Sequence, residues 1–285
     1  MNLFKFPIPN FNDKSKSTIF WRHMRFYSRK FLYYPQVKFL EKTLNMKGNE
    51  HLKNFFSNRP DACYNVTRRF CDKSFSANER VKTLIYDVNK GLESFKFLPQ
   101  DQIIFKFDED FELYLGSNRH VSEEGFWALS LRYQNAPIEQ CCFCFTLDNK
   151  LLISCIQGYQ YSDFNVLDIN KIFTKKCYGL RPIALLIECI KMLCVSLKLD
   201  ATLGVHEKNQ IRSQKGEDKG YFVDYQKIWL ENGGKLVKIN NHLYYELSHK
   251  RKNLEEIPSS KRSMYKKRFA ILEEIKQALD QSLFI

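Results

Sequence analysis

Residues 141–247 carry the sequence pattern that most constrains how this chain can fold. Two hydrophobic runs, 141–147 and 151–158, are separated by a short turn and predict a pair of strands. The stretch 179–199 then repeats apolar residues at helical spacing and is apolar nearly all round, as expected of a helix packed on a sheet. A further strand is expected at 201–206. Strand, helix and strand in this order predict an α/β unit whose loop-to-helix junction lies beyond the end of a strand, where open sheets bind ligands.

Further elements surround this unit. Helices are expected within 61–95, where Ser76 and Glu79 have the spacing of a capping box. A final helix is expected to begin near residue 259. Additional strands are expected at 103–107, 111–116, 126–134, 235–239 and 243–247, with a helix at 221–234. The pattern predicts an α/β (α+β) fold, in which a mixed sheet is joined to a helical N-terminal region and a C-terminal basic helix.

Three parts of the chain differ in composition. We expect a basic, aromatic N-terminal extension at 1–60, a helical region at 61–100 and an α/β domain with its C-terminal helix at 101–285. No apolar run approaches the roughly 20 residues of a membrane span, and no signal-peptide pattern begins the chain. The nine cysteines lie mostly within expected strands and helices, which favours a cytoplasmic protein. Peripheral association with the inner membrane stays open.

The positive charge is concentrated in two flanks. Residues 1–60 contain twelve Lys or Arg against three Asp or Glu, and residues 250–268 contain eight against two, within a net charge of +13. Such flanks attract an anionic partner, which is left open as nucleic acid, a lipid surface or a polyphosphate. The alternative is that lysines simply solvate the helices. No pair of CxxC motifs and no spaced histidines are present, so no metal is expected.

Four segments carry a resemblance to a known family. They are Gln157-Gly158, TKKCYGLRP (174–182), DYQKIWLENGG (224–234) and EEIPSSKRSMYKKRF (255–269). In sequence and order they resemble the bacterial VirK/YbjX family, the DUF535 domain, over roughly residues 60–280, with residues 1–60 outside it. The resemblance implies a link to virulence, envelope stress and resistance to antimicrobial peptides in Gram-negative bacteria, and it names no reaction.

The order of elements is also similar to that of GCN5-related N-acetyltransferases. This second resemblance implies an acyl-CoA N-acyltransferase-like sheet, with acyl-CoA or an acyl carrier protein as the donor. The loop before the central helix would then hold a pyrophosphate through backbone N–H groups and cations. The corresponding positions here are Lys175, Lys176, Gly179, Leu180 and Arg181, with Asn209 near the Asn that often follows the second core strand. The usual Arg/Gln-x-x-Gly-x-Gly loop is absent, Pro182 removes one N–H, and a connector of about fifteen residues, 159–173, precedes the loop.

Acyl transfer to an amine requires a base and a proton donor for the leaving thiolate. The same resemblance places Tyr221 or Tyr225 as the donor. The base candidates are Glu123, Glu124 and His206, and each also has an ordinary structural interpretation.

A basic cluster in the last expected helix is a further candidate site for a substrate or anion. Its members are Lys261, Arg262, Lys266 and Arg268. Cations in the first turns of a helix oppose its dipole, which indicates a function for them. Arg181 is open to two interpretations, a bidentate phosphate contact or an ion pair with Glu188.

Two functions remain open on the sequence alone. One is an N-acyltransferase that moves an acyl group from CoA or acyl carrier protein to an amine. The other is a non-enzymatic adaptor or regulator that binds anionic lipid or RNA through the basic flanks.

Overall fold

The computed structural model describes residues 3–10, 16–96, 100–118, 121–213 and 223–284. Its helices are α1 (Lys16–Leu32), α2 (Tyr34–Leu44), α3 (Glu50–Asn58), α4 (Pro60–Tyr64), α5 (Ala77–Ser94), α6 (Val166–Lys176), α7 (Pro182–Ser196), α8 (Tyr225–Glu231) and α9 (Ser259–Gln281). Its strands are β1 (Gln102–Lys106), β2 (Phe111–Ser117), β3 (Trp127–Tyr133), β4 (Ala136–Phe145), β5 (Leu151–Gly158), β6 (Thr202–Val205), β7 (Gly234–Ile239) and β8 (His242–Leu247). The mixed α+β fold with a helical N-terminal region and a C-terminal helix is confirmed.

The strands form a single sheet in the order β1-β2-β3-β4-β5-β6-β8-β7. Neighbouring strands are antiparallel except β5 and β6, which are parallel. Their pairing begins at Leu151 opposite Thr202 and ends at Ile153 opposite Gly204. Because β5 continues to Gly158 while β6 ends at Val205, the two strands separate and the far half of β5 has no strand partner on this side.

The two faces of the sheet bury hydrophobic clusters of very different size. Trp127 and Leu129 of β3 belong to the main hydrophobic core, which extends from Phe4 to Leu283. On the opposite face, Ala128 forms a small separate cluster with Cys142 and Cys155, its neighbours across β4 and β5. Residues of all three compositional parts contribute to the main core, so their division into domains stays a prediction.

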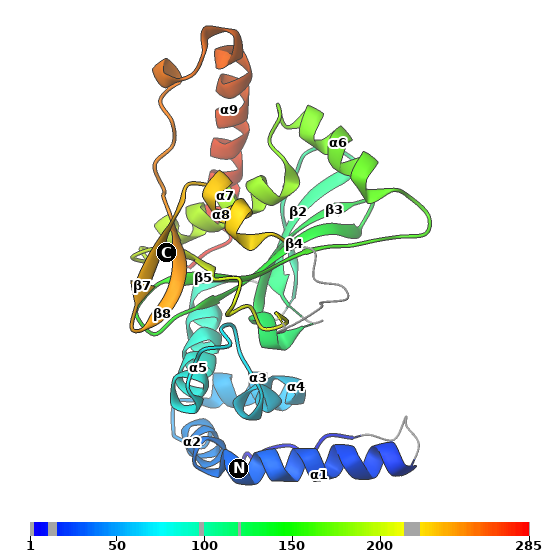
Figure 1. Ribbon diagram of the computed structural model, residues 1–285, viewed down its shortest axis with the longest axis vertical. Helices are drawn as coiled ribbons and strands as arrows, with labels where there is room; N and C mark the ends of the chain where they lie inside the picture. Colours follow the sequence, from blue (N-terminus) through cyan, green and yellow to red (C-terminus); the bar gives the residue numbers. More distant parts are fainter. Residues whose placement is uncertain (1–2, 11–15, 97–99, 119–120, 214–222, 285) are drawn as a thin grey trace.

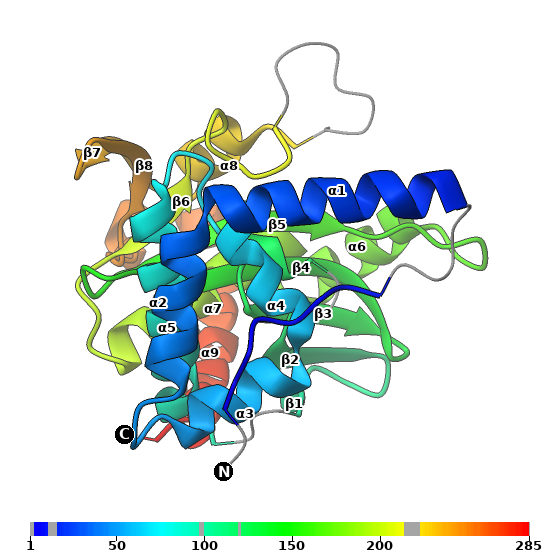
Figure 2. The same cartoon turned by 90° about the horizontal axis from the view of Figure 1, so that it is seen from below.

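Helices cover the apolar face from two directions. The nearly all-apolar α7 packs on β3 and β4, and α9 packs on α7 (Figure 1). Helix α5 reaches β4 from the N-terminal side, and α1 runs across this end of the molecule (Figure 2). The contact between α5 and the sheet is fixed by Trp127, whose indole N–H donates to the Asp87 carboxylate at 2.9 Å. In the described ranges, no helix has both the length and the apolar character that a membrane crossing requires.

Local signals explain most element boundaries. The capping box is confirmed, since the Ser76 hydroxyl accepts from the Glu79 N–H at 3.3 Å and the Glu79 carboxylate accepts from the Ser76 N–H at 2.8 Å. Strand β4 begins five residues before the expected 141. Gln134 and Asn135, both at positive φ, form the two-residue turn from β3 and bring the segment from Ala136 into the sheet.

The connector 159–173 contains a helix that the sequence pattern did not predict. Asn165 caps α6 by accepting the Leu167 N–H at 3.0 Å, so most of the expected connector is helical. The hydrophobic positions of α6 bury only Ile169 and Phe173, and this sparse pattern resembles a polar loop in sequence.

Replacing Gly91 with alanine should destabilise the protein. A Cβ atom at this position would lie 2.1 Å from Cζ2 of Trp127, which is fully buried. We expect a loss of about 1–3 kcal/mol in the free energy of unfolding, larger than the gain in helix propensity of roughly 1 kcal/mol. Lys82→Ala, an exposed change on the same helix, is the control and should shift stability by less than about 0.5 kcal/mol. Urea unfolding measures both, and a G91A protein as stable as the parent would refute this packing.

Candidate functional site

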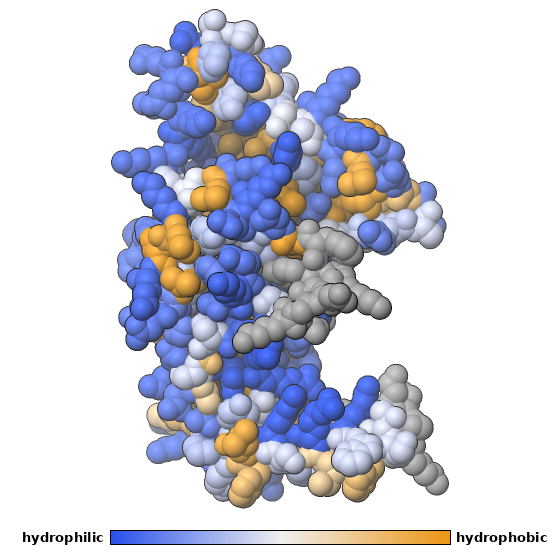
Figure 3. All heavy atoms as spheres, in the orientation of Figure 1, coloured by the Kyte–Doolittle hydropathy of each residue, from blue (hydrophilic) through white to orange (hydrophobic). Residues whose placement is uncertain are grey.

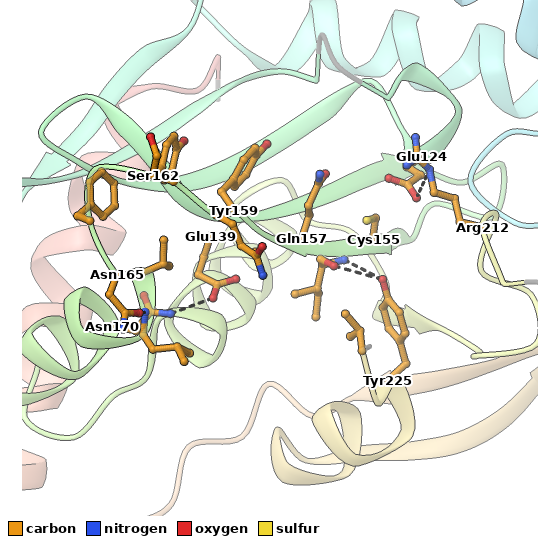
Figure 4. A pocket seen from close by; sticks show the side chains of 18 of the residues that line it. Glu124, Glu139, Cys155, Gln157, Tyr159, Ser162, Asn165, Asn170, Arg212 and Tyr225 are labelled. Atoms are coloured by element: carbon orange, nitrogen blue, oxygen red, sulfur yellow. Dashed lines mark hydrogen bonds and ion pairs between the residues drawn. The ribbon is translucent and has the colours of Figure 1, made fainter. Parts of the chain in front are cut away.

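A groove of about 950 Å³ lies where β5 separates from β6. Its walls come from the far half of β5 and the segment after it, from α6, from the loop after β6 and from the first residue of α8 (Figure 4). In open sheets with parallel strands, ligands bind beyond the carboxyl ends of the strands, at the point where neighbouring connections diverge. The groove occupies this position at the only parallel pair among the described strands.

The wall formed by β5 presents backbone groups. Tyr225 is 1% exposed, and its hydroxyl oxygen accepts the N–H of Ile156 at 3.0 Å. Asp224 fixes this end of α8 by accepting the Lys227 N–H at 3.0 Å. Because strand residues two apart direct their backbone groups the same way, the N–H and C=O of Gly158 point to the same edge as those of Ile156. The Tyr225 hydroxyl also donates to Ile156 O at 3.5 Å, so the backbone groups left for a ligand at this edge are those of Gly158.

Glu139 of β4 is the most perturbed carboxyl group of the groove. It lies opposite Gly158, is 8% exposed, and accepts from the Asn170 side-chain N–H at 3.1 Å (Figure 4). Burial raises its pKa to about 7, against which the Asn170 hydrogen bond acts only in part. At neutral pH this carboxyl group is therefore close to half ionised, as a general acid or base should be.

Asn170 contributes a second acceptor beside this carboxyl group. Its Oδ1 atom is buried and has no hydrogen-bond partner among the described residues. A carboxylate and an amide oxygen that line one groove match the donors of an amine or ammonium group.

Glu124 and its neighbours form the other end of the groove. The buried Glu124 carboxylate accepts from the Gln210 side-chain N–H at 2.9 Å, and Arg212 Nε lies 3.6 Å from the same oxygen. Burial raises the pKa of Glu124. The pKa of the adjacent Cys155 thiol is raised well above its usual value by its hydrogen bond with Cys142 and by burial, so Cys155 is not a thiolate nucleophile.

The structure brings two of the sequence-predicted catalytic residues, Tyr225 and Glu124, into one groove. His206 lies outside it: the ring stacks on Tyr245 and accepts the Lys208 N–H at 3.2 Å. Asn209 also lies outside it, and its backbone C=O accepts the Lys73 N–H at 2.8 Å. Tyr221 falls outside the described residues.

The loop expected to hold a pyrophosphate forms the C-terminal cap of α6. The Gly179 N–H donates to Thr174 O at 2.7 Å and the Leu180 N–H to Cys177 O at 3.0 Å, so both amides are used within the turn. None of the five predicted loop residues lines the groove. This geometry does not supply the backbone donors that the acetyltransferase resemblance implies at Gly179 and Leu180.

The cations of this loop point to other partners. Lys176 pairs with Asp108, and Arg181, with a side chain 76% exposed, lies 3.9 Å from Glu231. The alternative partner of Arg181, Glu188, is instead paired with Lys191 at 2.8 Å.

Two arginines of the α9 cluster have internal roles. Arg268 donates to Tyr178 O at 2.7 Å and 3.2 Å, and Arg262 donates to Ile257 O at 2.9 Å. These contacts hold α9 to the α6–α7 turn and to its own entry loop. Lys261 and Lys266 are exposed.

Glu139 and Asn170 were missed by the sequence analysis. Glu139 had no clear signal, because it precedes the apolar run 141–147 and lies in the mixed stretch 136–140. Asn170 had no signal in the sequence, because it lies in the connector 159–173, where no helix was expected. No group of three or more His, Cys, Asp or Glu side chains suited to a metal occurs in the described part of the chain.

Fold and groove define an α+β protein with a polar groove at a strand divergence. Within that class, the chain belongs to the family described as "Protein of unknown function (DUF535)", whose profile matches residues 15–281. The expected VirK/YbjX membership is thereby confirmed. The expectation that residues 1–60 lie outside the family is wrong, because the match begins at residue 15 and includes α1 to α3.

Several relatives support this membership. An uncharacterized protein of Haemophilus influenzae (strain Rd) is 32% identical over 92% of this chain and 89% of its own length. "Membrane protein LapB" of Mannheimia haemolytica is 33% identical over 74% of this chain and 96% of its own length. The uncharacterized protein YbjX of Escherichia coli K12 is 30% identical over 36% of this chain and 32% of its own length. No solved structure matches the chain.

Glu139→Gln should stabilise the protein increasingly as pH rises. The carboxyl group has a pKa of about 7 in the folded protein against a reference of 4.5, so the stability associated with its bound proton is lost as pH rises from about 4.5 through 7. Relative to the parent, the variant should gain roughly 2–3 kcal/mol between pH 5 and pH 8. Urea unfolding at the two pH values measures this gain. Glu93→Gln changes an exposed carboxyl group and is the matched control, with an expected effect on stability below about 0.5 kcal/mol. If Glu139→Gln stabilised the protein equally at both pH values, the raised pKa of Glu139 would be contradicted.

Proposed function

We propose that the groove at the β5–β6 divergence is the active site of an N-acyltransferase, which moves an acyl group from a phosphopantetheine thioester to an amine. The observation that carries the proposal is the buried Glu139 carboxyl, with a pKa of about 7, beside a strand edge that presents its backbone. Acyl-CoA and acyl carrier protein carry the same phosphopantetheine arm, so both remain candidate donors.

The strand edge suits the donor. The pantetheine arm is extended and contains two amide groups, which can add to a sheet edge in the way that a peptide strand does. The backbone groups of Gly158 can pair with one of these amides, because those of Ile156 are bound by the Tyr225 hydroxyl. The arm would run along β5 and bring its thioester toward the polar wall.

Glu139 and Asn170 suit the acceptor. An ammonium group held between these two oxygen acceptors transfers one proton to the Glu139 carboxylate and becomes a nucleophilic amine. The amine nitrogen attacks the thioester carbonyl carbon, a C–N bond forms, and the C–S bond then breaks to release a thiolate. Tyr225 is the proposed proton donor to that thiolate. Its hydroxyl, which donates to Ile156 O at 3.5 Å in the unliganded protein, would turn to the sulfur, and the Ile156 N–H stabilises the charge left on its oxygen. The second proton of the attacking nitrogen then passes to the Tyr225 oxygen, so that amide, thiol and a protonated Glu139 remain.

Glu139→Gln should abolish transfer while leaving donor binding in place. Acetyl-CoA and an alkylamine are the probes, and release of free thiol is the readout. In the parent protein kcat/KM should rise with pH to a plateau above about pH 7, because the base must be ionised. In the variant, kcat should fall by roughly 100-fold or more, and kcat/KM should no longer rise with pH. Glu93→Gln should behave as the parent.

Binding tests the same proposal without turnover. Isothermal titration of the folded parent with acetyl-CoA should give a saturable signal that Glu139→Gln retains. Absence of binding at high micromolar concentration, with a carrier-protein donor also inactive, would remove the enzymatic claim.

A second function is favoured by the surface of α1. Phe20, Met24, Tyr27 and Phe31 recur at the spacing of one helix face, and all are exposed, Phe31 to 85%. Arginines interleave with them, as on helices that lie in a membrane interface. One relative is titled a membrane protein. In this alternative the protein is a non-enzymatic adaptor at the inner membrane, and anionic lipid is favoured over RNA as the partner of its basic flanks.

Trp21→Ser/Phe31→Ser should weaken attachment to anionic vesicles. Both side chains are largely exposed, Trp21 to 68%, and insertion of each buries apolar surface. Co-sedimentation with phosphatidylglycerol-containing vesicles should fall by at least roughly tenfold in affinity. Leu230→Ser/Leu236→Ser, two exposed apolar residues elsewhere, is the control. Unchanged sedimentation, or salt-sensitive RNA binding that the aromatic changes leave intact, would count against the membrane.

A further inference from the structure

A second hollow, of about 1290 Å³, lies between α1 and the body of the protein. One wall is α1, the other is the segment 67–73, and the loop after β6 closes one end. In Figure 3, hydrophilic side chains gather near the lower end of the molecule, on the side of the hollow that α1 forms.

The walls of this hollow carry seven cationic side chains and one carboxylate. The cations are Arg22, Arg25, Arg29, Arg68, Arg69, Lys73 and Arg212, and the carboxylate belongs to Glu123. Arg22, Arg25 and Arg29 are spaced by three and four residues, so one face of α1 presents all three. This face is distinct from the exposed aromatic face of the same helix.

Part of this charge is not compensated by the protein. Arg25, Arg29 and Arg68 have no ion pair with an acidic residue in the described part of the chain. Burial, followed by repulsion from Arg68 and Arg25, lowers the pKa of Arg29. Gathering like charges in a concave surface raises the energy of the unliganded protein, and a bound anion would offset that repulsion.

Two other cations shape the hollow and connect it to the groove. Arg69 donates to Ile211 O at 3.2 Å, and Lys73 donates to the Ser213 hydroxyl at 2.8 Å, so both hold the loop after β6 in place. Arg212, which follows Ile211 in this loop, lines both the hollow and the groove. In the groove it faces Glu124. The two spaces therefore adjoin at one residue, Arg212.

We propose that this hollow binds the phosphate groups of the substrate, as a ligand with two or more neighbouring phosphates. The inference rests on the proposed acyl transfer, because it assigns a site to the phosphates of the donor. The backbone N–H groups of Gly179 and Leu180, which were expected to bind those phosphates, are used within their own turn. Guanidinium groups on facing walls match phosphate oxygens bidentately. A ligand with one carboxylate could not pair with Arg25, Arg29 and Arg68 together.

Binding of inorganic tripolyphosphate to the full chain tests the site directly. Isothermal titration at low salt should give one saturable site, and Arg25→Gln/Arg29→Gln should weaken it by at least roughly tenfold. Lys235→Gln/Lys238→Gln removes the same charge from the exposed strand β7 and should change affinity less than threefold. Arg25→Lys/Arg29→Lys keeps the charge and should retain part of the affinity, which excludes misfolding as the cause. Equal weakening by the β7 variant, or no effect of Arg25→Gln/Arg29→Gln, would overturn the assignment.

The source of the phosphates and the acyl-transfer proposal are separated by further arms. Glu139→Gln should bind tripolyphosphate as the parent does, so a failed transfer assay leaves this result standing. Coenzyme A that displaces tripolyphosphate identifies the donor as the source. Displacement by phosphatidylglycerol vesicles, and not by coenzyme A, identifies a lipid head group. Displacement by neither, at concentrations that saturate both, would overturn the assignment to a substrate.

Discussion

The hydrogen bond between the Tyr225 hydroxyl and the Ile156 N–H stabilises the sheet at the point where β5 separates from β6. Where β5 leaves β6, a strand loses its partner in the middle of a sheet, and its backbone groups need another one. Helix α8 supplies one such partner through a side chain, and Trp229 of the same helix donates to Val205 O at 2.9 Å on the diverging strand. One short helix thus spans both strands and keeps the divergence open.

Buried acidic groups have two different roles in this fold. Asp87 is fully buried, accepts from the Trp127 indole at 2.9 Å and the Phe145 N–H at 2.7 Å, and ties α5 to the sheet. Its pKa is raised by burial as well, so a raised pKa alone does not mark a functional group. Glu139 differs because its carboxyl group lines a groove and its neighbour Asn170 has an acceptor to spare. The surroundings of the carboxyl, and not its pKa, separate a structural acid from a candidate catalytic one.

Periodicity in the sequence was sufficient for α7, for α9 and for strands such as β3 and β5, because each of these elements buries a regular set of apolar residues. It was insufficient for α6, where only Ile169 and Phe173 are buried, and for the turn at Gly179. A glycine before a proline-initiated helix can begin an anion site or end the previous helix, and the choice depended on α6, which was not expected. Tyr225 and Glu124 were predicted from their places in the chain, whereas the Glu139–Asn170 pair depends on a contact across 31 residues. Sequence patterns of local range do not contain that contact.

The two basic flanks are similar in composition, but their arginines have different surroundings in the structure. Arg262 and Arg268 of α9 donate to carbonyl oxygens of the protein itself, which satisfies helix ends that would otherwise lack donors. The arginines of α1 face a hollow in which the opposing wall is also cationic. The position of a guanidinium group that donates to a carbonyl oxygen of its own chain is explained by the stability it gives the fold. The position of a guanidinium group that faces another cation has no such explanation. Lys38 and Arg59 of the first flank pair with Glu41 and Asp61. Arg25 and Arg29 have no such acidic partner among the described residues, and they are the cations to which the proposed anion would bind.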